Sequence, residues 1–104
     1  MAQRQLLDTR GEAKLSEFSG DVSKLEQWAF MFEAYAHLLG WGPIVEAAIR
    51  ESEPITLDRL GAEARAVNAD IYYLLAGKVK GPACSVVRLV ARGNGLEVAR
   101  RLYR

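Results

Sequence analysis

The stretch that decides the fold is TLDRLGAEARAVNADIYYLLA, which occupies residues 56–76. Its apolar residues recur at steps of three and four over nearly six turns of about 3.6 residues each, which is the period of a helix with one buried face. Thr56 is placed to cap the first turn, so we predict one long helix from Thr56 to about Ala76. The predicted buried face consists of Leu57, Leu60, Ala64, Val67, Ile71, Leu74 and Leu75.

The opposite side of this predicted helix carries small residues. Ala62, Ala66 and Ala69 share it with Tyr73, and such small side chains would let a second helix approach closely. High helix propensity alone also explains alanines on a solvent-exposed face. Both interpretations stay open, and the four residues are candidate contact residues.

A second helix is predicted upstream, over about residues 24–39, and Gly40 ends it. Ser23 and Glu26 have the spacing of a capping box at its start. Its apolar residues again recur at steps of three and four, which indicates a core face. That face consists of Leu25, Trp28, Ala29, Phe32, Tyr35, Ala36 and Leu39.

The other side of the same segment is apolar as well. It carries Phe30, Ala34 and Leu38, and Trp41 follows just beyond the predicted end. A helix that is apolar nearly all round either lies at the centre of its own bundle or contacts another subunit. In the second case Phe30 and Trp41 would be the anchors of that contact.

Two shorter helices are predicted where a proline takes a first helical position, at which its missing N–H costs nothing. One covers residues 43–50. The other covers residues 82–92, after which Gly93 ends it. The valines of this second segment would also suit a strand, but its proline start, its glycine stop and its helical surroundings favour a helix.

A last helix is predicted from Leu96 to the end of the chain, with Asn94 as cap and Glu97 three residues later. Since this helix still continues at Arg104, we expect a piece of a longer protein. The predicted fold is all-α, a compact bundle of about five helices in residues 18–104. A loosely ordered arm, residues 1–17, precedes it.

The composition indicates one small folded domain, with 104 residues of which 50% are hydrophobic and 26% charged. The single cysteine excludes an internal disulfide and favours a reducing, cytoplasmic setting. No stretch approaches the roughly 18 unbroken apolar residues of a membrane span, and the start lacks the apolar core of a signal peptide. No contact with a membrane is therefore expected.

The near-neutral charge hides a division along the chain. Residues 1–77 carry 7 basic and 12 acidic side chains, whereas residues 78–104 carry 7 basic side chains and one acid. Such a basic segment contacts nucleic acid, meets the acidic part of a second copy, or is an ordinary solvated surface. This predicted basic patch consists of Lys78, Lys80, Arg88, Arg92, Arg100, Arg101 and Arg104.

The sequence lacks a convergent set of catalytic groups. His37 has no persuasive serine, cysteine or aspartate partner by spacing, and no glycine-rich phosphate loop follows a strand. Cys84 is expected to be a small buried hydrophobic residue rather than a nucleophile. We therefore predict that the protein is not an enzyme and that it binds no cofactor, no metal and no small-molecule substrate.

Two groups of residues resemble the Gag polyprotein of LTR retrotransposons, in the region of the capsid N-terminal domain. The first is Phe18-x-Gly20 followed by Trp28 and Phe32-Glu33, and the second is RLVARGNGLEVARRLYR, residues 88–104. That family has a G-x-G-L-E-A-W-R-x-L type segment, and Val98-Ala99 stand here in place of its Ala-Trp pair. The resemblance spans residues 18–104. Its motif residues expected in the core are Phe18, Gly20, Trp28, Phe32, Gly95, Leu96 and Leu102.

The resemblance implies a structural capsid domain that self-associates into a shell around element RNA. The expected partners are further copies of the chain, with RNA contacted through the parent polyprotein. The family's Cys/His knuckle is absent from these residues. Two alternatives remain, a nucleic-acid-binding domain that uses the basic patch and a peptide-binding module with an apolar groove. The candidate contact residues are Phe30, Ala34, Trp41, Ala62, Ala66, Ala69 and Tyr73.

Overall fold

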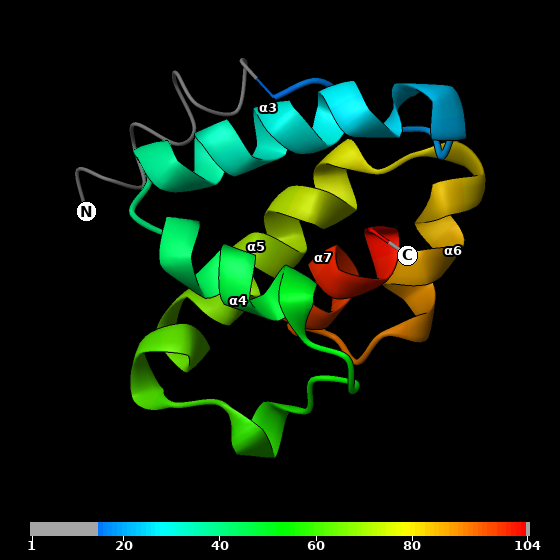
Figure 1. The fold of residues 1–104 in the computed structure, drawn as a ribbon. Coiled ribbons are helices and arrows are strands. Elements are labelled where there is room, and N and C mark those ends of the chain that lie inside the picture. The colour runs from blue at the N-terminus through cyan, green and yellow to red at the C-terminus, as the bar shows by residue number, and fades with distance from the viewer. Residues whose placement is uncertain (1–14, 104) are drawn as a thin grey trace.

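The computed structural model describes residues 15–103 (Figure 1). Five α-helices lie in this part of the chain, which confirms the predicted all-α class. They are α3 (Leu25–Leu38), α4 (Gly42–Arg50), α5 (Ala62–Lys78), α6 (Cys84–Leu89) and α7 (Gly95–Leu102). The 3-10 helices η2 (Val22–Lys24), η3 (Leu57–Arg59) and η4 (Gly81–Ala83) precede α3, α5 and α6.

Helix α7 lies at the centre of the bundle. It packs against α5, α4 and α6, while α3 packs against α4 along one edge of the molecule (Figure 1). Gly95 allows α7 to lie close to α5, because a Cβ atom at this position would clash with the backbone of Ile71 and Tyr72 in α5. The glycine of the motif is therefore required by helix packing, and Leu96 and Leu102 are buried as predicted.

The aromatic residues of the other motif form a stack in the core. The ring centroids of Phe18 and Trp28 lie 5.1 Å apart, and those of Trp28 and Phe32 lie 5.3 Å apart. The indole N–H of Trp28 donates to the carbonyl of Ser16 at 2.8 Å, and Leu15 is buried beside the stack. Leu15 and the backbone of Ser16 thus contact the core. The remainder of the arm, residues 1–14, lies outside the described part.

The long helix predicted over residues 56–76 begins later than expected. Leu60 has an extended backbone, with φ −82° and ψ 139°, so α5 begins at Ala62. Arg65 donates to the carbonyls of Leu57 and Leu60 at 3.3 and 3.4 Å, and these bonds replace those of a continuous helix. The apolar spacing continues across this break, which is why the periodicity did not indicate it.

The start of α3 is capped differently from the prediction. Asp21 caps η2, and its carboxylate accepts from the N–H and the hydroxyl of Ser23 at 3.0 and 2.7 Å, whereas α3 itself has no side-chain cap. These hydrogen bonds hold the pKa of Asp21 below its ordinary value. The predicted capping box of Ser23 and Glu26 is wrong, because η2 inserts one short turn before the α-helix begins.

The C-terminal helices follow the prediction in type. The segment with the valines is helical, although α6 covers only Cys84–Leu89 and Val90 is already extended. At the end of α7 the Tyr103 hydroxyl donates to Glu33 of α3 at 2.8 Å. Burial raises the pKa of Tyr103 and Glu33 raises it further, so the hydroxyl keeps its proton and ties α7 to α3.

Candidate interaction surfaces

A buried polar cluster joins α5, α7 and the α4–α5 loop, residues 51–61. Asn68 of α5 is 2% exposed, and its side-chain oxygen accepts from the N–H of Leu96 at 2.8 Å. Its amide nitrogen donates to Asn94 at 3.2 Å, and Asn94 in turn donates to the carbonyl of Ile55 at 2.9 Å. Asn94 is the N-cap residue of α7, as predicted, but its side chain makes no capping hydrogen bond, and Asn68 of the neighbouring helix α5 accepts from the first turn in its place.

Glu97 is the charged member of this cluster. One of its oxygens accepts from the N–H of Ile55 and from Arg100, both at 2.8 Å, and the other accepts from Arg100 at 2.9 Å and Arg101 at 2.7 Å. Burial raises the pKa of Glu97, but the hydrogen bonds from Arg100, Ile55 and Arg101 outweigh it and lower the pKa to about 2. The carboxylate thus stays charged and holds the α4–α5 loop against α7.

The basic patch is smaller than predicted because of this carboxylate. Arg100 is only 7% exposed and its guanidinium is bound to Glu97, so its inclusion in a surface patch is wrong. Arg101 is partly exposed but also bonds to Glu97. Helical spacing explains both, since positions three and four after Glu97 lie on its own face. Of the other members, Lys80, Arg88 and Arg92 are exposed, Lys78 is half-buried and Arg104 lies outside the described part.

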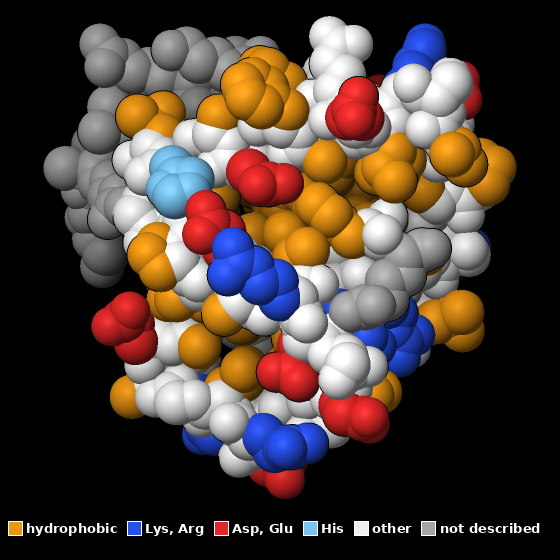
Figure 2. All heavy atoms as spheres, in the orientation of Figure 1, with side chains coloured by type: hydrophobic (Ala, Val, Ile, Leu, Met, Phe, Trp, Pro, Cys, Tyr) orange, Lys and Arg blue, Asp and Glu red, His pale blue; other side chains and the backbone are white. Residues whose placement is uncertain are grey.

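The predicted outer face of α3 is exposed. Phe30 is 71% exposed and Leu38 is 67% exposed, and the exposed Ala34 lies one turn from each. We call these three residues the α3 stripe. Figure 2 shows hydrophobic side chains along the outer edge of the molecule over α3. Side chains this large and apolar at such exposure mark a surface that favours a protein contact.

Trp41 does not belong to that surface. It is 6% exposed, and its backbone N–H donates to the carbonyl of Ala36 at 2.7 Å. Gly40 turns the chain with φ +80°, a conformation that glycine adopts without strain, and so directs the following indole inward. The prediction of Trp41 as a contact anchor is therefore wrong, and the residue packs in the core.

The small-residue face of α5 lies in solvent. Ala62, Ala66 and Ala69 are exposed, and Tyr73 is 59% exposed and packs edge-on against the ring of Tyr72 at 5.1 Å. The sequence therefore located this face correctly. Its use as a contact stays a prediction, because alanines on an exposed helix face also reflect helix propensity.

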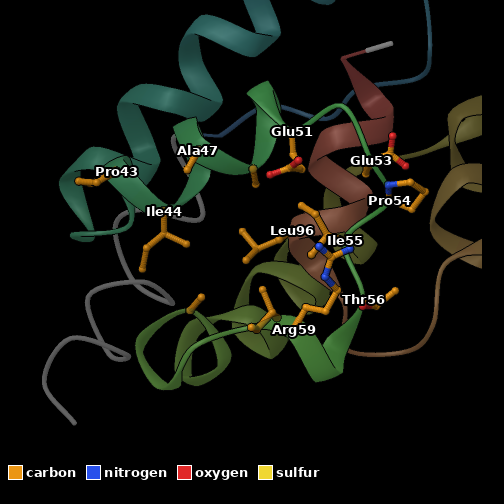
Figure 3. A pocket seen from close by; sticks show the side chains of 13 residues that line it. Pro43, Ile44, Ala47, Glu51, Glu53, Pro54, Ile55, Thr56, Arg59 and Leu96 are labelled. Atoms are coloured by element: carbon orange, nitrogen blue, oxygen red, sulfur yellow. The ribbon is translucent and has the colours of Figure 1, made fainter.

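An apolar cleft of about 430 Å³ lies between α4, the α4–α5 loop and the start of α5 (Figure 3). Ile44 of α4 and Leu96 of α7 point into it from opposite sides, and Arg59 reaches back toward the loop (Figure 3). The sequence did not reveal this cleft, since its walls come from α4, the α4–α5 loop, α5 and α7. It is lined by Pro43, Ile44, Ala47, Ala48, Glu51, Glu53, Pro54, Ile55, Thr56, Arg59, Leu60, Ala64 and Leu96.

The one histidine has a partner that its spacing did not suggest. Nε2 of His37 lies 2.7 Å from a carboxylate oxygen of Glu46, across the corner between α3 and α4. Gly42 lies directly beneath the imidazole, where a Cβ atom would clash with the ring. Both side chains are exposed, so the pair is a surface link between two helices. The half-buried Cys84 lies at the start of α6.

Metal sites and membrane-spanning helices are both absent from residues 15–103. No group of three or more histidine, cysteine or acidic side chains is arranged there to hold a metal ion. No helix in the same residues combines the length and apolar character that a membrane span needs.

No protein-family model, curated protein or solved structure matches this chain.

Proposed function

We propose that this chain is a structural domain of the Gag capsid type, whose copies self-associate to build a shell. The observation that carries the proposal is the α3 stripe, where Phe30 and Leu38 are both more than 60% exposed although their helix belongs to the core. The resemblance of residues 18–104 to retrotransposon Gag supports it. We place the assembly in the cytoplasm, where one unpaired cysteine stays reduced.

The stripe suits a weak contact that is repeated many times. From Phe30 to Leu38 it extends for about 12 Å at about 1.5 Å per residue. Two such stripes packed together bury far less than the roughly 800 Å² per partner of a stable complex. A shell holds together through many contacts of this size, each of which forms and breaks reversibly.

Light scattering against protein concentration tests this function. The native chain is expected to grow in mass with concentration, and Phe30→Ser is expected to remove that growth without loss of stability, because the side chain is exposed. Val22→Ser is the matched control, since Val22 is 81% exposed and lies outside the stripe. Equal association of the native chain and Phe30→Ser would contradict the assignment of the stripe.

The nucleic-acid alternative loses support from the binding of Arg100 and Arg101 by Glu97. The exposed members of the basic patch that do not bond to Glu97 are Lys80, Arg88 and Arg92. This alternative predicts affinity that falls steeply with salt, with a log–log slope of about −0.9 per phosphate neutralised on duplex DNA. A native chain whose mass grows with concentration in the absence of nucleic acid favours self-association instead.

A further inference from the structure

Leu89 differs in its charge surroundings from the other exposed hydrophobic residues among residues 15–103. It is 75% exposed at the end of α6, and the exposed Arg88 and Arg92 flank it along the chain, while Asp58 and Glu97 line the same surface hollow. Phe30, by contrast, has Glu26 and Glu33 one turn away on either side. The other exposed large hydrophobic residues are Val22, Met31, Leu38, Leu57 and Tyr73.

The apolar cleft carries the opposite charge. The charged side chains that line it are Glu51, Glu53 and one basic residue, Arg59, which sum to one negative charge, and the two glutamates also act on the buried Arg100. Its volume of about 430 Å³ is within the range of about 300–1,000 Å³ that is typical of ligand-binding sites. An occupant that complements both the apolar walls and the two glutamates presents an apolar side chain flanked by positive charge.

We propose that the cleft is a docking site for a second copy of this chain, which inserts Leu89 and places Arg88 and Arg92 beside Glu51 and Glu53. Opposite charges across a contact favour the correct partner, whereas like charges oppose it. Phe30 is excluded as the occupant by the same reasoning, since its acidic neighbours would face the acidic rim. This docking site rests on the proposed self-association and names a second contact for it, distinct from the α3 stripe.

The position of Leu89 suits a reciprocal contact. Leu89 lines a second hollow of about 420 Å³, and this hollow shares Pro54, Ile55 and Thr56 of the α4–α5 loop with the cleft. The inserted side chain and the receiving cleft are therefore neighbours on one surface. Neighbouring complementary sites are what a two-fold contact requires, because each copy then gives and receives one side chain.

A charge exchange tests the docking site by sedimentation equilibrium at low salt. The variants are Arg88→Glu with Arg92→Glu, Glu51→Arg with Glu53→Arg, and the chain that carries all four changes. Each pair is expected to weaken association about tenfold or more, because like charges then meet. The fourfold variant, and an equal mixture of the two paired variants, are expected to associate within about threefold of the native chain.

Controls separate charge from folding. Lys24→Glu with Lys80→Glu gives the same net charge as the arginine pair at two other exposed positions, and it is expected to associate like the native chain. Leu89→Ser removes only the inserted side chain and is expected to weaken association without unfolding, as circular dichroism would verify. It also keeps the proposal testable if the arginines introduced at the cleft prevent folding.

The outcomes distinguish this docking site from the proposed function. Association that Phe30→Ser abolishes, but that Leu89→Ser and both charge pairs leave unchanged, overturns the docking site and leaves the α3 stripe as the contact. Weakened pairs without recovery in the fourfold variant and the mixture also overturn it. A native chain that stays monomeric up to about 1 mM overturns both proposals and leaves the cleft to a foreign peptide.

Discussion

Replacing Glu97 with glutamine tests the reasoning about the buried polar cluster. Glutamine keeps an acceptor for the N–H of Ile55 but removes the charge that Arg100 requires, and Arg100 is only 7% exposed. Breaking a buried ion pair by removing one partner costs about 3–5 kcal/mol. The retained hydrogen bond and the partial exposure of Arg101 reduce the expected loss in the free energy of unfolding to about 2–3 kcal/mol at neutral pH.

The pH dependence gives an independent value for the same interaction. The pKa of Glu97 falls from its ordinary value of 4.5 to about 2 on folding, since hydrogen bonds outweigh the effect of burial. At about 1.4 kcal/mol per pH unit this difference corresponds to about 3 kcal/mol, which solvent screening near Arg101 reduces to about 2. Because the folded pKa is depressed, this stability is present above about pH 4.5 and is lost as the pH falls toward 2.

Urea unfolding followed by tryptophan fluorescence measures both effects, because Trp28 and Trp41 are buried and become exposed on unfolding. The difference between the native chain and Glu97→Gln is expected to shrink to about half or less at about pH 3, because Glu97 is protonated there in the unfolded chain while it is still mostly charged in the folded one. Glu17→Gln, at an exposed carboxylate, is the control. A difference below about 0.5 kcal/mol at neutral pH, or one that is unchanged in acid, would refute this account of the cluster.

Three further substitutions are expected to change the free energy of unfolding, measured in the same urea assay. Gly95→Ala in α7 is expected to cost about 1–3 kcal/mol or more, because its methyl group meets the backbone of α5. Gly77→Ala in α5, where the added methyl group has open space, is expected to stabilise the fold by about 0.5–1 kcal/mol. If both glycines respond alike, close packing at Gly95 is the wrong explanation. Trp41→Ala is expected to cost about 3–5 kcal/mol as a core deletion, and a variant as stable as the native chain would return Trp41 to the surface. Asn68→Ala is expected to cost about 2 kcal/mol through the lost cap of α7 and the unpaired amide of Asn94, while a loss below about 0.5 kcal/mol would argue against that cap.

Local patterns were sufficient to predict the helices and most of the core. The three-and-four spacing along α3 and α5 placed Trp28, Phe32, Ile71 and Leu74 inside, and all four are buried. Such spacing works because the helical period is a property of the backbone, whatever the helix later packs against. The same argument placed Phe30 correctly on the outside of α3.

The cleft and the basic surface were not predictable in this way, because they depend on segments far apart in the chain. The cleft has walls from α4, the α4–α5 loop, α5 and α7, so no single window of sequence contains it. The basic surface depends on one carboxylate, since Glu97 withdraws Arg100 from solvent and bonds to Arg101. A count of charges gives their number and not their exposure.

The sequence by itself therefore determined the all-α class and the helical faces, which follow from the apolar spacing within each helix. Only the tertiary structure decided that Trp41 turns inward, that Asn68 caps α7 and that Glu97 binds the loop at Ile55. The physical reason is that Asn68 and Glu97 bond to backbone groups that lie 28 and 42 positions away in the chain. The direction of Trp41 depends on the turn at Gly40, which packing decides. A buried polar group requires a partner, but its own sequence neighbourhood does not specify which one.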